Sequence, residues 1–360
     1  MKNHRGFSIV ELMVAITLAL IVTTGVISVF VGSRAAYQST AGVGAVAEGG
    51  RFALDFLQQA VRNAGYMACD NTQKQISILN AATTLPFNFT QPLGGFEAKN
   101  TGGAGAYSIA AAPVAPDGAT GHWAGTGLDP SLAAPPLVVQ NTDVLVVRES
   151  LPNSQAVYVT AIVDGANNFT VNLQGSLVNG ELAVISDCAK SAAMQITNIS
   201  GGPANAVITH QAGGVPGNTA SAFPVSFGIG SQVTPIDTII YYIGQGADGD
   251  GALWAYDLNA TNVFTATELV PDIEAMQILY GVDVNGTQTV GEYITADQVI
   301  DFNTVISVKI AVLAASQPGS RSIPAVAPTY TLLGNTVTVP RDSRARQVFE
   351  ITIGVRNAAS

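Results

Sequence analysis

Charged side chains are scarce in this chain of 360 residues. Lys, Arg, Asp and Glu together make up 11% of the sequence, whereas an average soluble protein has about 25%. The formal net charge is −10, so the chain lacks the basic surface that displaces counterions from nucleic acid phosphates. This balance excludes nucleic acid as a main partner, and an uncharged polar surface suits packing against other proteins.

Residues that commonly carry catalysis are also few. The chain has three histidines, of which His122 and His210 lie far apart in the sequence. It contains no Gly-x-Ser-x-Gly elbow, no P-loop and no Cys-x-x-Cys pair. The sequence therefore predicts no enzymatic activity and no histidine-held metal.

One long run of residues lacks charge altogether. No charged residue occurs from Leu12 to Ser33, and about 20 apolar residues are enough to cross a membrane as a helix. Lys2 and Arg5 precede this run, whereas Arg34 alone follows it closely. The positive-inside rule then places the N-terminus in the cytoplasm and most of the chain outside the inner membrane.

Glu11 stands at the edge of the apolar run. A carboxylate at mid-bilayer costs roughly 2.5–3.5 kcal/mol on insertion scales, so a functional role is expected for it. A secretory signal peptide would be interrupted by Glu11, and no small-x-small cleavage site follows. A plain membrane anchor explains the apolar run but gives no role to Gly6, Phe7 or Glu11.

The segment from Gly6 to Ala15, Gly-Phe-Ser-Ile-Val-Glu-Leu-Met-Val-Ala, resembles the processing site of a type IV prepilin. The resemblance implies that a prepilin peptidase cuts after Gly6 and methylates the new N-terminal Phe7. Glu11 would then neutralise the α-ammonium of its own or a neighbouring subunit, which lowers the cost of burying both charges.

The two cysteines are Cys69 and Cys188. An even count outside the cytoplasm favours a disulfide between them. Two buried free thiols are the alternative.

A second helical stretch follows the apolar run, from Arg34 to Ala64. Phe52, Phe56, Ala60 and Ala64 recur every four residues, which predicts a stripe that faces the core. Gly65 is placed to end the helix, and we expect a break at the glycines between Gly42 and Gly50. The predicted layout is a leader (1–6), a transmembrane helix (7–33), an amphipathic half-helix (34–65) and a periplasmic β-rich region (66–360) with an irregular Gly/Ala/Pro-rich stretch (92–136).

The rest of the chain alternates apolar and polar residues between turn residues, which is typical of antiparallel strands with one covered face. A long helix packed on such a sheet is an α+β, pilin-like fold. Glu268 to Leu279 is expected to form a short helix or a bent strand. The predicted strands are Asp143–Arg148, Val157–Val163, Phe169–Leu173, Leu182–Ser186, Ala206–Thr209, Thr238–Ile243, Leu253–Leu258, Val305–Leu313, Tyr330–Leu333 and Gln347–Val355.

Five later blocks are similar to the PilW-type minor pilins of the type IV pilus. They are Gly50–Leu57 with Arg62–Cys69, Asp143–Arg148, Ser186–Cys188, Leu269–Asp283 and Arg346–Asn357.

The resemblance implies a low-copy subunit, stored in the inner membrane and then assembled into the surface pilus. It implies a minor-pilin complex that primes assembly at the fibre tip and supports adhesion and twitching motility. The implied partners are other minor pilins, the major pilin, the prepilin peptidase, the inner-membrane assembly platform and a PilY-type tip adhesin. A minor pseudopilin of a type II secretion system and a membrane-anchored periplasmic enzyme or binding protein are the alternatives.

Two short acidic turns are candidate calcium sites. Asp248 and Asp250 belong to an Asp-Gly-Asp-Gly sequence, and Asp283 and Asn285 to Asp-Val-Asn-Gly. Their oxygens are suitable calcium ligands, but the twelfth-position Glu of an EF-hand is missing from both. Ordinary turn chemistry explains both sequences equally well.

Overall fold

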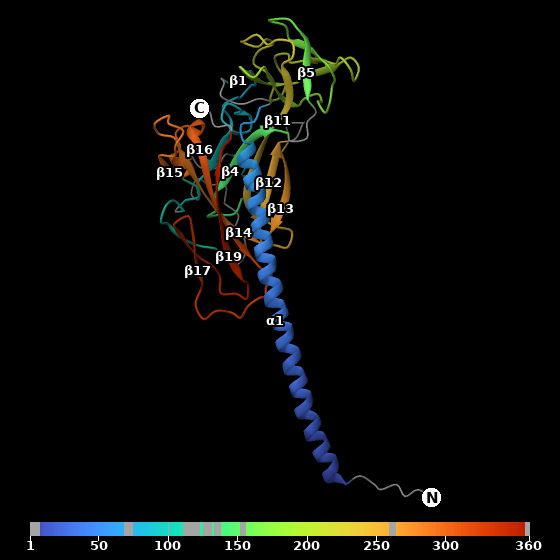
Figure 1. Ribbon diagram of the computed structural model, residues 1–360, viewed down its shortest axis with the longest axis vertical. Helices are drawn as coiled ribbons and strands as arrows, with labels where there is room; N and C mark the ends of the chain where they lie inside the picture. The colour runs from blue at the N-terminus through green and yellow to red at the C-terminus, as the bar shows by residue number, and fades with distance from the viewer. Residues whose placement is uncertain are drawn as a thin grey trace, which may run out of the picture.

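The structure is a computed structural model that describes residues 8–67, 75–99, 101–110, 123–124, 132, 138–151, 156–258 and 264–356. One long helix, α1, protrudes from a β-rich body, and the N-terminus lies at the far end of the protruding part (Figure 1). Strands β5–β10 lie in a small distal lobe at the opposite end of the molecule (Figure 1).

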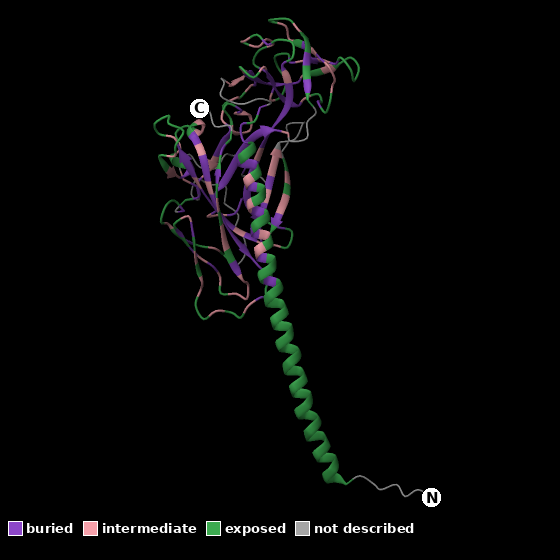
Figure 2. Cartoon of the chain, in the orientation of Figure 1, coloured by how far each residue is buried: buried purple, intermediate pink, exposed green. Residues whose placement is uncertain are grey.

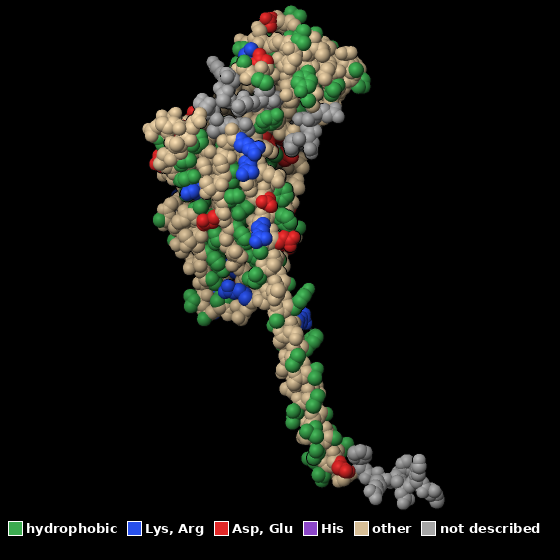
Figure 3. Space-filling view, in the orientation of Figure 1, with side chains coloured by type: hydrophobic (Ala, Val, Ile, Leu, Met, Phe, Trp, Pro, Cys, Tyr) green, Lys and Arg blue, Asp and Glu red, His purple; other side chains and the backbone are tan. Residues whose placement is uncertain are grey.

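Helix α1 spans Ile9–Asn63, or 55 residues, and is about 80 Å long at ~1.5 Å per residue. Every residue from Ser8 to Ala41 is exposed, whereas the second half is partly buried against the body (Figure 2). Within the described residues, α1 is long and apolar enough to cross a membrane, and hydrophobic side chains line its protruding part (Figure 3). Gly65 follows the helix with a φ of 74°, the left-handed conformation that often ends helices.

The break expected between Gly42 and Gly50 does not occur, since α1 is continuous there. Both glycines are buried against the body, and a Cβ at either position would overlap another side chain. Ser320 lies against Gly42, and the Phe349 ring lies against Gly50. Each glycine costs the helix about 1 kcal/mol of intrinsic propensity, and the close approach that it permits offsets this loss by packing.

Within the described residues, the strands form three sheets. The largest has 12 strands, another has the order β15-β14-β16-β19, and the smallest has the order β17-β18-β3. The strands are β1 (Gln75–Ser77), β2 (Leu93–Phe96), β3 (Ala106–Ser108), β4 (Val144–Ser150), β5 (Val157–Ile162), β6 (Asn168–Val171), β7 (Leu182–Ser186), β8 (Ser191–Gln195), β9 (Asn198–Ser200), β10 (Val207–Thr209), β11 (Gln232–Gln245), β12 (Gly251–Leu258), β13 (Phe264–Pro271), β14 (Ile273–Val282), β15 (Glu292–Ile294), β16 (Val305–Ala315), β17 (Thr329–Leu332), β18 (Asn335–Thr338) and β19 (Arg346–Gly354). Short 3-10 helices span Leu85–Phe87 (η1), Ala296–Gln298 (η3) and Phe302–Thr304 (η4).

Each of the ten predicted strands has an observed counterpart. The expectation for Glu268 to Leu279 needs correction, because this stretch contributes to two strands, β13 and β14, with a sharp turn at Asp272. Within the stretch expected to be irregular, Leu93–Phe96 forms β2 and pairs with β4.

Strand β11 connects the two ends of the body. Its first residues pair with β5 and β7 in the distal lobe, and its later residues pair with β4 and β12. The main core lies between α1, the β4–β11–β12 strands and the β14–β16–β19 strands, whereas the distal lobe has a separate core. The helix is therefore held by the part of the body that is nearer the N-terminus.

Candidate functional site

The described N-terminal end of α1 is a capping box. The Ser8 hydroxyl accepts from the Val10 amide at 3.3 Å, and the Ser8 amide donates to Glu11 Oε2 at 3.0 Å. Glu11 thus satisfies a free donor of its own helix and lies at the positive end of the helix dipole. The sequence-predicted processing residues Gly6 and Phe7 lie outside the described residues.

The second half of α1 uses a different face from the one predicted. Leu57, Ala60 and Ala64 are buried, as expected, but Phe52 and Phe56 are 49% and 43% exposed. The buried face instead begins with Gly42, Val46 and Gly50 and continues through Ala53 and Val61. Small residues face the body because the backbone approaches it closely, and the two phenyl rings are left on one flank of the helix.

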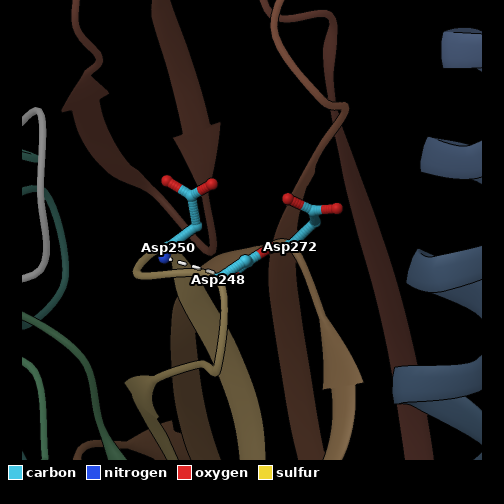
Figure 4. Close-up of side chains that lie close together, drawn as sticks. All are labelled: Asp248, Asp250 and Asp272. Carbon is cyan, nitrogen blue, oxygen red and sulfur yellow. Dashed lines mark hydrogen bonds between the residues drawn. The ribbon is translucent and has the colours of Figure 1, made fainter.

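The structure brings the first calcium candidates together with a residue that the sequence analysis missed. Carboxylate oxygens of Asp248, Asp250 and Asp272 lie within 4.8 Å of one another, and the three side chains gather at one corner (Figure 4). Arg344 forms ion pairs with Asp250 and, at 3.4 Å, with Asp272. The Gln317 amide donates to Asp272 Oδ2 at 2.9 Å. Arg344 thus supplies positive charge where a metal ion would, and calcium binding stays a prediction.

The second calcium candidate is a separate turn. Asp283 Oδ1 accepts from the backbone amides of Asn285 and Thr287, each at 3.1 Å, and Oδ2 accepts from the Gln288 amide at 2.6 Å. Backbone donors thus occupy both carboxylate oxygens, as in an ordinary Asx turn.

Two carboxyl groups are buried where the large sheet meets β14. Asp143 accepts from the amides of Ala98 and Ile278, at 3.0 and 2.8 Å. Glu97 Oε1 accepts from Thr101 at 2.9 Å, and its Oε2 is buried without a partner in the described part of the chain. Burial raises the pKa of Glu97 to about 7 and raises the pKa of Asp143 well above its usual value. Burial therefore favours the protonated forms of both carboxyl groups, and the Asp143 bonds to Ala98 and Ile278 join the large sheet to β14.

Of the remaining predicted residues, Cys69 and His122 lie outside the described residues. Cys188 occupies a tight turn with a φ of 64°, and its disulfide with Cys69 stays a prediction. His210 is fully buried in the distal lobe, and its ring stacks on Phe223 with centroids 4.2 Å apart. Burial lowers the pKa of His210 to about 4, so this histidine is a neutral core residue.

Sequence signals for the missed residues were weak. Asp272 adopts a φ of 59°, a conformation that aspartate tolerates better than most residues. It comes to lie beside Asp248 only because β12 pairs with β13. The sequence pattern places Asp143 at the start of a strand. Its hydrogen-bond donors, the amides of Ala98 and Ile278, are distant from it in the sequence.

Comparison with known proteins gives two family matches. Residues 1–27 match the prokaryotic N-terminal methylation motif, and residues 240–357 match the family described as type IV pilus-assembly protein W, PilW. No curated protein matches the chain. Among solved structures, the chain is similar to a type IV-like pilin from Thermus thermophilus, with 15% identity, a TM-score of 0.24, and coverage of 51% of this chain and 86% of that chain.

The methylation motif and the apolar helix on a β-rich body define a membrane-anchored subunit of the type IV pilin class. The second match covers β14, β16 and β19, on which the helix rests. Together, the two family matches support a PilW-type minor pilin of the type IV pilus. Proteins of this class are structural subunits that associate with other pilus components.

Proposed function

We propose that this minor pilin acts in a complex with other minor pilins that primes pilus assembly and stays at the fibre tip. There it supports adhesion and twitching motility and presents a PilY-type adhesin. The observation that carries the proposal is the division of α1 into a fully exposed apolar half and a half held on the body. Such a helix serves first as a membrane anchor and then as a surface for contacts with other subunits.

The proposed precursor has a leader (1–6), a transmembrane helix (7–33), an amphipathic half-helix (34–65) and a periplasmic body (66–360). Its N-terminus is cytoplasmic, because Lys2 and Arg5 precede the apolar run. Cys69 and Cys188 form a disulfide in the periplasm. The subunit has no catalytic activity of its own and works by binding.

The prepilin peptidase cuts after Gly6 and methylates Phe7, and the new α-ammonium is a partner for Glu11. In the described structure, Glu11 binds the Ser8 amide of its own helix. A neighbouring α-ammonium therefore competes with this cap and offers a stronger, charge-assisted hydrogen bond.

Intact-mass spectrometry of the membrane-extracted chain tests the processing step. We expect loss of Met1 to Gly6 and gain of one methyl group on Phe7, only in cells that contain the prepilin peptidase. An uncleaved N-terminus, or a cut beyond Ser33, would overturn the proposal.

Counting of surface pili in a deletion strain tests the assembly role. We expect few or no pili without this chain, and restoration by the wild-type chain but not by Glu11→Ala. Asp55→Ala is the matched control, because Asp55 is also an exposed carboxylate of α1 but lies beyond the apolar run. Normal piliation together with a defect in type II secretion would instead favour the pseudopilin alternative.

A further inference from the structure

The loop between β16 and β17, residues 316–328, presents apolar and basic side chains. Ile323 and Val326 are 63% and 76% exposed, and Arg321 lies in the same loop. No Asp or Glu occurs in the loop, although the whole chain has a net charge of −10. Exposed apolar side chains next to basic ones are the composition of surfaces that lie against anionic lipid headgroups.

Hydrogen bonds to the segment before β19 hold the loop on the body. The Gly319 amide donates to Ser343 Oγ at 2.7 Å, and the Arg321 amide donates to the Ser343 carbonyl at 3.0 Å. Arg341 Nε donates to the Pro324 carbonyl at 3.2 Å. Arg341 thus adds a second positive charge beside the loop, and the loop presents its side chains from a fixed position.

The loop lies at the end of the body from which the exposed apolar half of α1 protrudes (Figure 1). Ser320 packs against Gly42, the first buried residue of α1. Gly42 is nine positions after Ser33, which is about 14 Å along the helix at ~1.5 Å per residue. The headgroup layer takes up about 5–8 Å of this distance. Tyr37, which is 76% exposed, lies at the height of this layer, where tyrosine is enriched in membrane proteins.

A modest tilt of α1 closes the remaining distance of about 6–9 Å. Transmembrane helices are tilted by about 20° on average, and the loop extends to one side of α1 (Figure 1). A tilt toward that side lowers Ile323 and Val326 to the headgroups. Over such a distance, which is comparable with the Debye length of about 8 Å at physiological salt, anionic headgroups attract the guanidinium groups.

Four carboxylates near this loop have polar partners of their own. They are Asp248, bonded to Gln317, Asp250 and Asp272, both paired with Arg344, and Asp342, paired with Arg346. Among the described residues, neither Arg321 nor Arg341 has a carboxylate partner. On the visible face, hydrophobic and basic side chains lie at the lower end of the body (Figure 3). The unpaired positive charge therefore lies on and beside the loop, whereas the acidic corner lies at its start.

We propose that this loop docks on the surface of the membrane that holds α1. Ile323 and Val326 enter the headgroup layer, and Arg321 and Arg341 bind the phosphates of anionic phospholipids. The contact orients the body of the stored subunit, and extraction of α1 for assembly breaks it. The inference rests on the proposed function, because it requires the transmembrane helix of the membrane-stored subunit.

Spin labelling of the full-length chain in vesicles of phosphatidylethanolamine and phosphatidylglycerol tests the contact. A nitroxide attached through p-acetylphenylalanine at position 323 leaves the native cysteines untouched and should collide more with oxygen than with a water-soluble nickel chelate. Position 300 is the matched control, because Ile300 is fully exposed and lies at the opposite end of β16; its label should collide mainly with nickel. Equal accessibility at the two positions would overturn the inference, as would spin–spin broadening from contact with a second copy.

Removal of charge provides the second test. Arg321→Gln and Arg341→Gln should each lower the ratio of docked to undocked loop about fivefold, the effect of one basic residue near an anionic surface. Arg356→Gln, which changes an exposed arginine beyond the opposite end of β19, should leave the ratio unchanged. Equal docking by the Arg321→Gln chain, or on vesicles of phosphatidylcholine alone, would overturn the inference. Unchanged unfolding midpoints separate loss of contact from loss of folding.

The outcomes separate the inference from the proposed function. If the chain stays in the vesicles after a carbonate wash but the label at position 323 collides freely with nickel, the docking fails and the membrane-stored subunit stands. If carbonate releases the chain, the transmembrane helix of the proposed function fails.

Discussion

Replacement of Gly42 by alanine tests whether glycine allows α1 to approach the body. A Cβ at this position would overlap both Cβ and Oγ of Ser320, whereas a Cβ at Gly44 would meet nothing within 4 Å. Both substitutions raise helix propensity by about 1 kcal/mol, so this gain cancels in the comparison. The remaining difference is the overpacking at Ser320, which typically costs 1–3 kcal/mol.

We therefore expect Gly44→Ala to stabilise the full chain by about 1 kcal/mol and Gly42→Ala to be about 1–3 kcal/mol less stable than Gly44→Ala. Thermal unfolding of the detergent-extracted protein measures this, at roughly 2–4 °C for each kcal/mol. Ser320→Gly combined with Gly42→Ala should recover much of the loss, because it removes the overlapping atoms. If Gly42→Ala were as stable as Gly44→Ala, the close approach of α1 to Ser320 at Gly42 would be refuted.

Three further predictions concern buried ionisable groups. The pKa of Glu97 is about 7, above its ordinary value of 4.5, so wild-type stability should fall by about 3 kcal/mol as pH rises from 4.5 to 7. Urea unfolding should show that Glu97→Gln flattens this fall, and an equal fall with pH in the variant and the wild type would contradict the prediction. The pKa of His210 is about 4, below its ordinary value of 6.5, so stability should fall by about 3 kcal/mol as pH drops from 6.5 to 4. His210→Phe should remove this dependence. If the variant unfolded in acid at the same midpoint pH as the wild type, the buried neutral histidine would be refuted. The Arg346 side chain is 2% exposed and pairs with Glu274 and Asp342 at 2.6 Å each, so Arg346→Met should lower the free energy of unfolding by about 3–5 kcal/mol. Calorimetry should show that adding Glu274→Gln recovers part of this stability, and an equal loss in the double variant would argue against the pairing.

Most strands could be predicted because apolar and polar residues alternate with a period of two wherever one face of a sheet is covered. Val305 to Leu313 and Gln347 to Val355 were predicted in this way and pair as β16 and β19. The pattern failed for Glu268 to Leu279, where β13 and β14 meet at Asp272. A one-residue turn is too short to interrupt an apolar pattern, so only the three-dimensional pairing separates the two strands.

The buried face of α1 and the carboxyl pair could not be predicted for a different reason. Phe52 and Phe56 have the spacing of a core stripe, but the stripe that packs best depends on the surface opposite the helix. Ser320 and Phe349 form part of that surface and are far from the helix in sequence. Likewise, Glu97 and Asp143 become partners only when β2 pairs with β4.

The sequence by itself determined the pilin class, the long apolar helix and most strands. These features depend on local quantities: the cost of charge in a membrane, the length of an apolar run and the period of side chains along it. Only the tertiary structure decided which face of α1 is buried and which carboxylates lie together. Those features depend on the shape and charge of surfaces that distant segments build, and no local pattern encodes them.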